Sequence, residues 1–278
     1  MLNPQTGRDK IMKTVFDIIR LTPKTNCGKC GFATCMTFAV AVINSNLSQN
    51  TCPYLEKTYC QEGYTAAAGP KNPETALVKE LKSRLIGIDL TQKAGGLGAA
   101  TIQTKSGTAL KLLYLGREVV ISEGGVYDLS GQELDPRDQI LLYNYLFFGG
   151  SGRLSQEWVG LESFPNSISK VVTLRRYTEE KLAAAFEGDI SGLEAAAHNL
   201  GAKPAGPCHA DLCLTIPVLP MVPLQIHFWD ADREDGFEAR VKVLFDKTAL
   251  DFLDMESLVF ASERTAEMLI ERRHGAGE

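Results

Sequence analysis

Four cysteines near the beginning of the chain could hold a metal cluster. Cys27, Cys30, Cys35 and Cys52 follow the spacing Cys-x2-Cys-x4-Cys-x16-Cys. Thiolates are the usual ligands of iron–sulfur clusters, and four of them suit one cubane. We therefore expect these four residues to bind one 4Fe-4S cluster.

The residues around the cysteines suit the wrapping of a small anionic core. Gly28 and Gly31 supply the conformational freedom that a tight turn needs. The apolar run 36–43 predicts a helix, which would place Cys35 at a helix N-terminus, where exposed N–H groups favour negative charge. A proline directly follows the last cysteine, as it does in ferredoxin-type motifs.

Other uses of the thiols are open. Structural zinc also takes four cysteines, but zinc modules usually contain a second short cysteine pair, which this spacing lacks. Disulfides are disfavoured there, because seven cysteines are an odd number and no charged-then-apolar signal segment precedes them. Cys60 could be a core residue, a spare thiol or a ligand in place of Cys52, but the Cys-Pro pair favours Cys52.

A set of residues in this segment matches known cluster modules: Cys27, Gly28, Cys30, Gly31, Cys35, Phe38, Ala39, Cys52 and Pro53. The segment resembles the four-cysteine module of the corrinoid/iron–sulfur protein large subunit, and a similar module in the B subunit of the Rnf electron-transport complex. The resemblance covers about the first quarter of the chain and implies a low-potential cluster that passes single electrons. It implies no corrinoid binding by this chain, because the remaining sequence shows no counterpart of the corrinoid-holding barrel.

Charge is spread unevenly along the chain, whose net charge is −5. Residues 1–64 carry seven Lys/Arg and four Asp/Glu, whereas residues 65–278 carry 22 and 30, so the cysteine-rich part is basic and the rest acidic. Lys24, Lys29 and Lys57 could raise the cluster's potential and offer a docking surface to an acidic redox partner protein, or could simply solubilise a small domain.

The composition is that of a soluble globular protein, with 44% hydrophobic and 23% charged residues. No apolar run approaches the ~18–20 residues that span a bilayer, so we expect no membrane span and a cytoplasmic location. An acidic chain without a basic stripe argues against nucleic-acid binding. The sequence also lacks a phosphate-binding loop and a dinucleotide fingerprint.

Small residues and prolines in residues 65–74 indicate a linker. We expect a cluster-binding module in residues 1–64 and a larger domain in residues 75–278. In the module, apolar residues at helical spacing predict a helix over residues 8–21 that ends before Pro23. The expected fold class is α+β, with a small helical 4Fe-4S module followed by a larger mixed domain with antiparallel strands.

The larger domain mixes strands and helices without regular βαβ repeats, which favours α+β over a doubly wound fold. A hairpin or meander is expected over residues 108–129. Further strands are expected at 212–218, 223–230 and 239–245, and helices at 75–90 with a break at Gly87, at 137–148, from Thr178, at 192–200 and at 256–272.

Short runs in the larger domain carry a second resemblance: Leu115-Gly116, Gln139 to Leu142, Tyr145-Leu146, Pro220 to Pro223, Phe228 to Asp230 and Leu244 to Asp246. They resemble an uncharacterised domain-of-unknown-function family (DUF3786) of anaerobic bacteria and archaea, sometimes found behind this kind of cluster module. The match spans most of residues 75–272. It supports a domain boundary and implies no activity.

The segment from Cys208 to Cys213 contains two thiols, His209 and a carboxylate within six residues. It could be a second metal site or a redox pair, with His227 or Asp230 as further ligands. Alternatively, Cys213 is a buried strand residue and Cys208 a loop thiol.

Acidic residues follow Trp229 closely: Asp230, Asp232, Glu234 and Asp235. Paired carboxylates could do acid–base work, but nothing in the sequence brings them to a shared proton. We expect an exposed acidic turn.

Three functions fit these features. The leading hypothesis is an iron–sulfur protein of anaerobic metabolism that moves single electrons to or from a redox partner, for example a corrinoid-bearing or other cofactor-bearing protein. The second is a redox enzyme with a further cofactor or metal in the larger domain, with Cys208, His209 and Asp230 near the reaction. The third is a binding protein whose cluster is structural or senses redox state.

Overall fold

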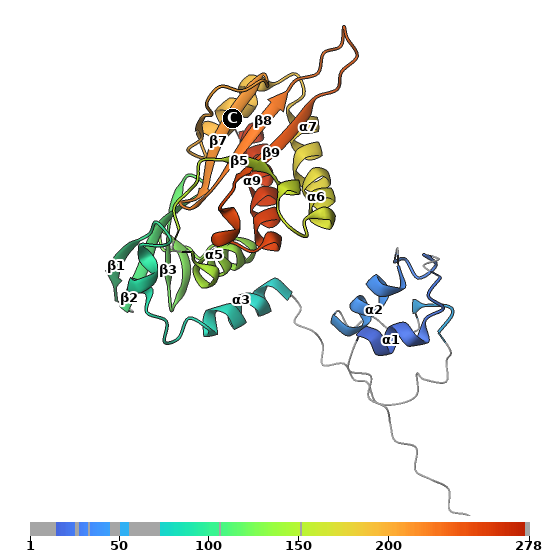
Figure 1. Cartoon of the computed structure of the whole chain (residues 1–278). Coiled ribbons are helices and arrows are strands. Elements are labelled where there is room, and N and C mark those ends of the chain that lie inside the picture. Colours follow the sequence, from blue (N-terminus) through green and yellow to red (C-terminus); the bar gives the residue numbers. More distant parts are fainter. Residues whose placement is uncertain are drawn as a thin grey trace, which may run out of the picture. The chain divides into compact units, whose positions relative to one another are not determined.

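The computed structural model describes residues 15–25, 28–32, 34–44, 51–55, 73–105, 107–150 and 152–275. The chain divides into two compact units, Met1–Ala76 and Leu77–Glu278 (Figure 1). Most of the expected linker, Cys27, Lys57 and Cys60 lie outside the described residues. Helices and antiparallel sheets together confirm the expected α+β class, with a small helical N-terminal region.

Two helices form the described part of the first unit, α1 (Val15–Leu21) and α2 (Cys35–Asn44). Helix α1 confirms the helix predicted over residues 8–21 for the part that is described. Helix α2 confirms the helix predicted over the run 36–43 and begins at Cys35, as expected. The two helices contact each other. Their small core consists of Ile18, Phe38, Ala39, Cys52 and Leu55.

The first sheet of the second unit is an antiparallel meander in chain order, which confirms the expected hairpin or meander. Its strands are β1 (Ala100–Thr104), β2 (Gly107–Tyr114), β3 (Arg117–Ser122) and β4 (Gly125–Asp128). The sequence did not predict β1, because this edge strand is polar and mostly exposed and so lacks a buried apolar face.

The second sheet has five antiparallel strands in the order β5-β9-β8-β7-β6. Its strands are β5 (Trp158–Gly160), β6 (Lys203–Pro204), β7 (Leu212–Leu219), β8 (Val222–Trp229) and β9 (Arg240–Asp246). The three long strands confirm the predicted ones. Leu115, at the turn after β2, donates its N–H to the Val218 carbonyl at 3.0 Å and so links the two sheets.

The helices of the second unit are α3 (Pro73–Ser83, beginning in the first unit), α4 (Leu90–Ala94), α5 (Pro136–Phe148), α6 (Ile168–Leu174), α7 (Glu180–Phe186), α8 (Ile190–His198) and α9 (Met255–Gly275). A π-helical turn, Arg175–Glu179, joins α6 to α7, and short 3₁₀ turns lie at Leu161–Ser163 and Ala249–Asp251. The helix expected from Thr178 therefore begins ten residues earlier. Exposed Ile168 and Val172 concealed the helical pattern of α6.

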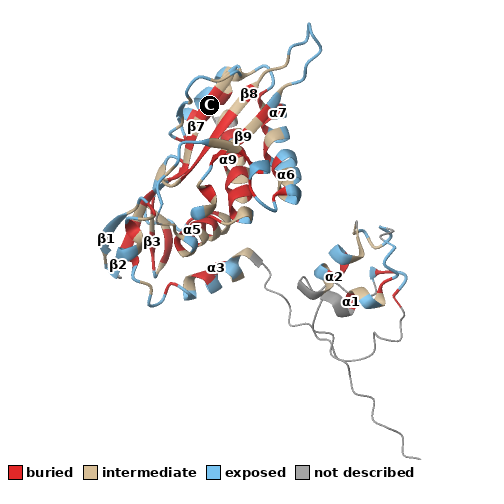
Figure 2. Ribbon diagram, in the orientation of Figure 1, coloured by how far each residue is buried: buried red, intermediate tan, exposed pale blue. Residues whose placement is uncertain are grey.

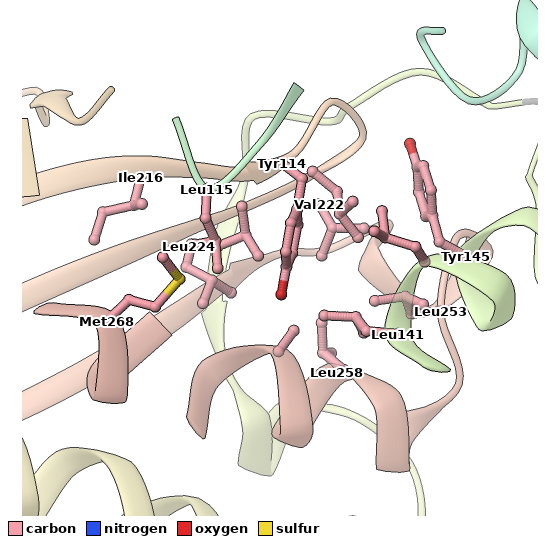
Figure 3. Close-up of a cluster of buried hydrophobic side chains, with 14 of the residues drawn as sticks. Tyr114, Leu115, Leu141, Tyr145, Ile216, Val222, Leu224, Leu253, Leu258 and Met268 are labelled. Atoms are coloured by element: carbon pink, nitrogen blue, oxygen red, sulfur yellow. The ribbon is translucent and has the colours of Figure 1, made fainter. Parts of the chain in front are cut away.

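One hydrophobic core fills the second unit. Side chains at alternate positions of β7 and β8, such as Ile216 and Leu224, meet Leu141 of α5 and Leu258 of α9 around Tyr114 (Figure 3). Figure 2 shows the same pattern along the ribbon, since buried residues line the central strands and the inner face of α9. The second unit thus has its own core, separate from that of the first.

Candidate metal centre

Three of the four predicted cluster ligands surround one small cavity in the first unit. Cys30, Cys35 and Cys52 all line it. Cys52 is 6% exposed, and the other two are half-buried. The fourth predicted ligand, Cys27, lies outside the described residues.

A tight glycine turn places Cys30 at the cavity. The N–H of Gly31 donates to the carbonyl of Gly28 at 2.9 Å. Both glycines have positive φ angles, +71° and +84°, which residues with a Cβ rarely adopt. An added Cβ would meet nothing within 4 Å at either position, so the backbone conformation rather than crowding calls for glycine here.

Reciprocal capping places Cys35 as the first residue of α2, as predicted. Thr34 accepts the N–H of Thr37 on its hydroxyl at 3.1 Å, and Thr37 accepts the N–H of Thr34 on its own at 3.2 Å. The Thr37 hydroxyl also donates to the Thr34 carbonyl at 2.8 Å. These bonds fix the helix start, so the N-terminal end of the helix dipole stabilises negative charge at this cysteine.

A lysine ties together the two loops that carry Cys30 and Cys52. Lys29 Nζ lies 2.6 Å from the Tyr54 hydroxyl and 5.3 Å from the centre of its ring. Lys29 directly precedes Cys30, and Tyr54 lies two residues after Cys52. The contact therefore holds a positive charge close to the cavity.

The residues present fit an iron–sulfur cluster. The rings of Phe32 and Phe38 meet edge to face, with centroids 5.9 Å apart. Both residues line the cavity and give it an apolar wall. Thiols with apolar walls and a helix N-terminus are the environment in which an anionic cluster is stabilised. Among the described residues, no three His, Cys, Asp or Glu side chains are arranged to hold a single metal ion.

The second predicted group, from Cys208 to Cys213, does not form a metal site. The two sulfurs are joined in a disulfide, with the Cα atoms 6.5 Å apart. The metal-site interpretation and the free loop thiol are both wrong for Cys208, because its sulfur is bonded to Cys213. Cys213 is a buried residue of β7, as predicted, and the redox-pair interpretation is compatible with the bond.

The carboxylates after Trp229 bind backbone amides instead of one another. Asp230 accepts the N–H of Gly188 and of Ala231, each at 2.8 Å. Asp232 accepts from the N–H groups of Glu234 and Asp235. The predicted exposed acidic turn is confirmed, and it borders an open hollow with few apolar walls.

A buried ionic network, which no sequence pattern indicated, surrounds Asp138, a residue that is 2% exposed. Its carboxylate accepts from the Tyr114 hydroxyl at 2.8 Å, Arg264 Nε at 2.9 Å and Arg117 Nη2 at 2.9 Å. Burial, together with the charge of Asp138, raises the pKa of Tyr114. The network joins β2, β3, α5 and α9, and the partners lie too far apart in sequence to be paired by spacing.

A second buried carboxylate that no sequence pattern indicated is Asp246, which is 1% exposed. It accepts hydrogen bonds from the backbone and hydroxyls of Ser155 and Thr248 and from the Gln156 N–H. Burial alone raises its pKa, but the bonds from Thr248 and Ser155 outweigh burial and hold the pKa below its ordinary value. The carboxylate fixes the loop before β5 to the end of β9.

Two parts of the chain match described families. Residues 23–54 match the family described as Putative Fe-S cluster, and residues 89–268 match the Domain of unknown function (DUF3786). No solved structure matches the chain significantly. Within the described part of the chain, every helix is too short or too polar to span a bilayer.

Curated relatives share only a short stretch. The acetyl-CoA decarbonylase/synthase complex subunit gamma of Methanothermobacter thermautotrophicus is 50% identical over 42 residues, 15% of this chain and 9% of the relative. The corrinoid/iron–sulfur protein large subunit of Moorella thermoacetica is 39% identical over 57 residues, 20% of this chain and 13% of the relative.

These matches support an iron–sulfur role for the N-terminal segment. The chain covers only a small fraction of the length of these relatives, so the shared part is a module and not a whole protein. The longer match, to residues 89–268, covers well over half of the chain and coincides with the second compact unit. The chain therefore belongs to the DUF3786 family, whose domain has no known function.

Proposed function

We propose that the chain is an iron–sulfur protein of anaerobic metabolism that holds one 4Fe-4S cluster and exchanges single electrons with a partner protein. The proposed ligands are Cys27, Cys30, Cys35 and Cys52. The observation that carries the proposal is that Cys52 lines the same cavity as Cys30 and Cys35. When bound, the cluster supplies a one-electron couple at low potential.

The chain's own residues tune and protect that couple. The α2 N-terminus and Lys29 place positive potential beside the ligands, which stabilises the more negative reduced state. Phe32 and Phe38 exclude water from the cavity and so shield its sulfur atoms from solvent.

The surface of the module suits an acidic redox partner. Met36, Val40 and Tyr54 are 45%, 38% and 47% exposed, Lys24 and Lys29 are exposed as well, and Lys29 contacts Tyr54. Apolar side chains with a basic rim favour docking of a protein with a complementary acidic rim. The name of the Moorella thermoacetica relative, a corrinoid/iron–sulfur protein large subunit, suggests a corrinoid-bearing protein as one such partner. We place the chain in the cytoplasm.

The first experiment is metal analysis and electron paramagnetic resonance on protein purified without oxygen and reduced with dithionite. We expect about four irons and four sulfides per chain and a low-temperature rhombic signal, as a reduced cubane gives. One zinc without iron would overturn the proposal. An iron cluster whose oxidation state neither dithionite nor a strong oxidant changes would refute electron transfer, while the proposal of a cluster-binding site would stand.

Single Cys→Ala variants test the ligand set. Each change at Cys27, Cys30, Cys35 or Cys52 should remove most of the iron and sulfide, because a cubane needs all four corners. Cys60→Ala is the matched control and should retain both. If Cys60→Ala loses the cluster while Cys52→Ala retains it, the fourth ligand has been assigned wrongly.

A further inference from the structure

We propose that Cys208 and Cys213 form a reversible dithiol–disulfide centre that exchanges two electrons with a dithiol partner. This proposal concerns the second unit and does not depend on the cluster. It rests on the redundancy of the bond, the unequal exposure of its two residues and the histidine opposite Cys213.

The disulfide is redundant for holding its loop. It closes a loop of sequence separation 5, and short loops gain least from cross-linking. Trp229 Nε1 already donates to the His209 carbonyl at 3.0 Å, and the Asp230 N–H donates to Asp211 Oδ2 at 2.8 Å. Because these bonds anchor the loop to the end of β8, the loop can remain in place when the sulfurs separate.

The two sulfur-bearing residues differ in access. Cys208 lies half-buried in the loop before β7, beside exposed Pro207 and His209, whereas Cys213 is 8% exposed within the strand. An incoming thiolate can therefore approach Cys208 more readily than Cys213. This asymmetry assigns Cys208 as the sulfur attacked and Cys213 as the leaving group.

A histidine faces Cys213 across the strand pair. Cys213 and His227 are register partners of β7 and β8, and such partners have Cβ atoms about 4.5–5.5 Å apart on the same face. His227 Nε2 lies 3.2 Å from Gln225 Oε1, and the Gln225 amide nitrogen donates to the Thr215 hydroxyl at 3.2 Å. This chain of bonds makes Nε2 a donor and leaves Nδ1 as a proton acceptor. Burial lowers the pKa of His227, which favours the neutral form.

The exchange balances without a further reagent. A thiolate of the partner attacks Cys208 Sγ, the Cys208–Cys213 bond breaks, and Cys213 leaves as a thiolate. The partner's second thiol then resolves the mixed disulfide, so the partner is oxidised to a disulfide and this chain holds two thiols. In the reverse direction, the Cys208 thiolate attacks the partner's disulfide, which forms the mixed disulfide and releases one partner thiolate. His227 Nδ1 then takes the proton of Cys213, and the resulting thiolate attacks Cys208 Sγ, so the Cys208–Cys213 bond forms and the partner's second sulfur leaves as a thiolate.

The test uses the full chain and a direct count of thiols. Cleavage after Lys181 and Arg233, with Lys203 protected by the following proline, gives a tryptic peptide whose only cysteines are Cys208 and Cys213. The protein is incubated with reduced dithiothreitol or reduced thioredoxin, without denaturant, and alkylated before digestion. We expect both reagents to open the disulfide while the circular dichroism spectrum is unchanged, and oxidised glutathione, a stronger oxidant than the disulfide forms of the two reductants, to restore it.

Variants test the assigned roles. His227→Gln should slow reoxidation of the pair by oxidised glutathione about tenfold without unfolding the protein. The effect is no larger because a thiol of pKa about 8.5 is already a few per cent ionised at neutral pH. His198→Gln, at an exposed position of α8, is the control and should react like the wild type. Cys208→Ser should keep the thermal midpoint within a few degrees.

Two results would overturn the proposal. A disulfide that resists dithiothreitol and thioredoxin until urea unfolds the protein would be a structural cross-link. Cysteines that stay as thiols in excess oxidised glutathione would not be a redox pair at all.

Discussion

Loss of the cluster should unfold the first unit and leave the second intact. Among the described residues of the first unit, the buried cluster has three large apolar side chains, Ile18, Phe38 and Leu55, beside Ala39 and Cys52. Modules of this size rarely fold on a core so small, and metal binding then supplies the missing free energy. The second unit has a separate core and contains no proposed ligand.

The helices give the size of the expected signal. Among the described residues, α1 and α2 contain 7 and 10 helical residues. The helices from α3 onward, counted with the π turn, contain 11, 5, 13, 7, 5, 7, 9 and 21. The first unit therefore holds roughly a sixth to a fifth of all described helical residues. Ellipticity at 222 nm should fall by about that fraction when the cluster is removed.

The assay compares holo-protein with Cys30→Ala and with chelator-treated protein. Circular dichroism measures the helix lost, and hydrogen exchange with peptide resolution locates it. Exchange should become fast over α1 and α2 and stay slow over β7, β8 and α9. An unchanged spectrum would show that the module folds without its cluster, and fast exchange throughout would show that the second unit depends on it. Either result would refute the reasoning.

Three further predictions concern the second unit. Asp138→Asn should lower the free energy of unfolding by about 3–5 kcal/mol in denaturant titrations, because it removes the buried carboxylate that pairs with both Arg117 and Arg264, of which Arg264 keeps its ion pair with Glu267; a loss below 1 kcal/mol would contradict this. Gly116→Ala should lower the thermal midpoint clearly more than Gly206→Ala. At Gly116 φ is +78° and the new Cβ would lie 2.8 Å from the backbone of Leu200, whereas an added Cβ at the control position, Gly206, would meet nothing within 4 Å. Equal midpoints for the two variants would refute the steric argument. Asp246→Asn should cost about 1.5–3 kcal/mol near pH 7. The pKa of Asp246 is lowered on folding, so this contribution is complete above the unfolded pKa of about 4 and is lost as the pH falls through the pKa of the folded state. Unfolding curves at several pH values should therefore show the difference in free energy of unfolding between wild type and variant shrinking as the pH falls. A difference that stays constant with pH would refute the linkage.

The sequence by itself determined what depends on local spacing. Apolar patterning located α2, α5, α8 and α9 and the strands β7 to β9, because each of these elements buries at least one apolar face. The apolar pattern did not locate β1 and α6, which lack such a face. The cysteine spacing, the two glycines and the apolar run also indicated where Cys35 would stand at a helix start, because capping and turn geometry are local.

Tertiary structure decided which distant residues meet. It brought Cys52 to the cavity of Cys30 and Cys35, collected two arginines and a tyrosine around Asp138, and paired β7 with β8 so that a histidine faces Cys213. The bond between Cys208 and Cys213 likewise depends on how the loop is held against the end of β8. The cysteine motif had indicated that Cys52 belongs with Cys30 and Cys35. Sequence spacing carries no information about the other contacts, since they arise from sheet register and helix packing, which the whole core determines together.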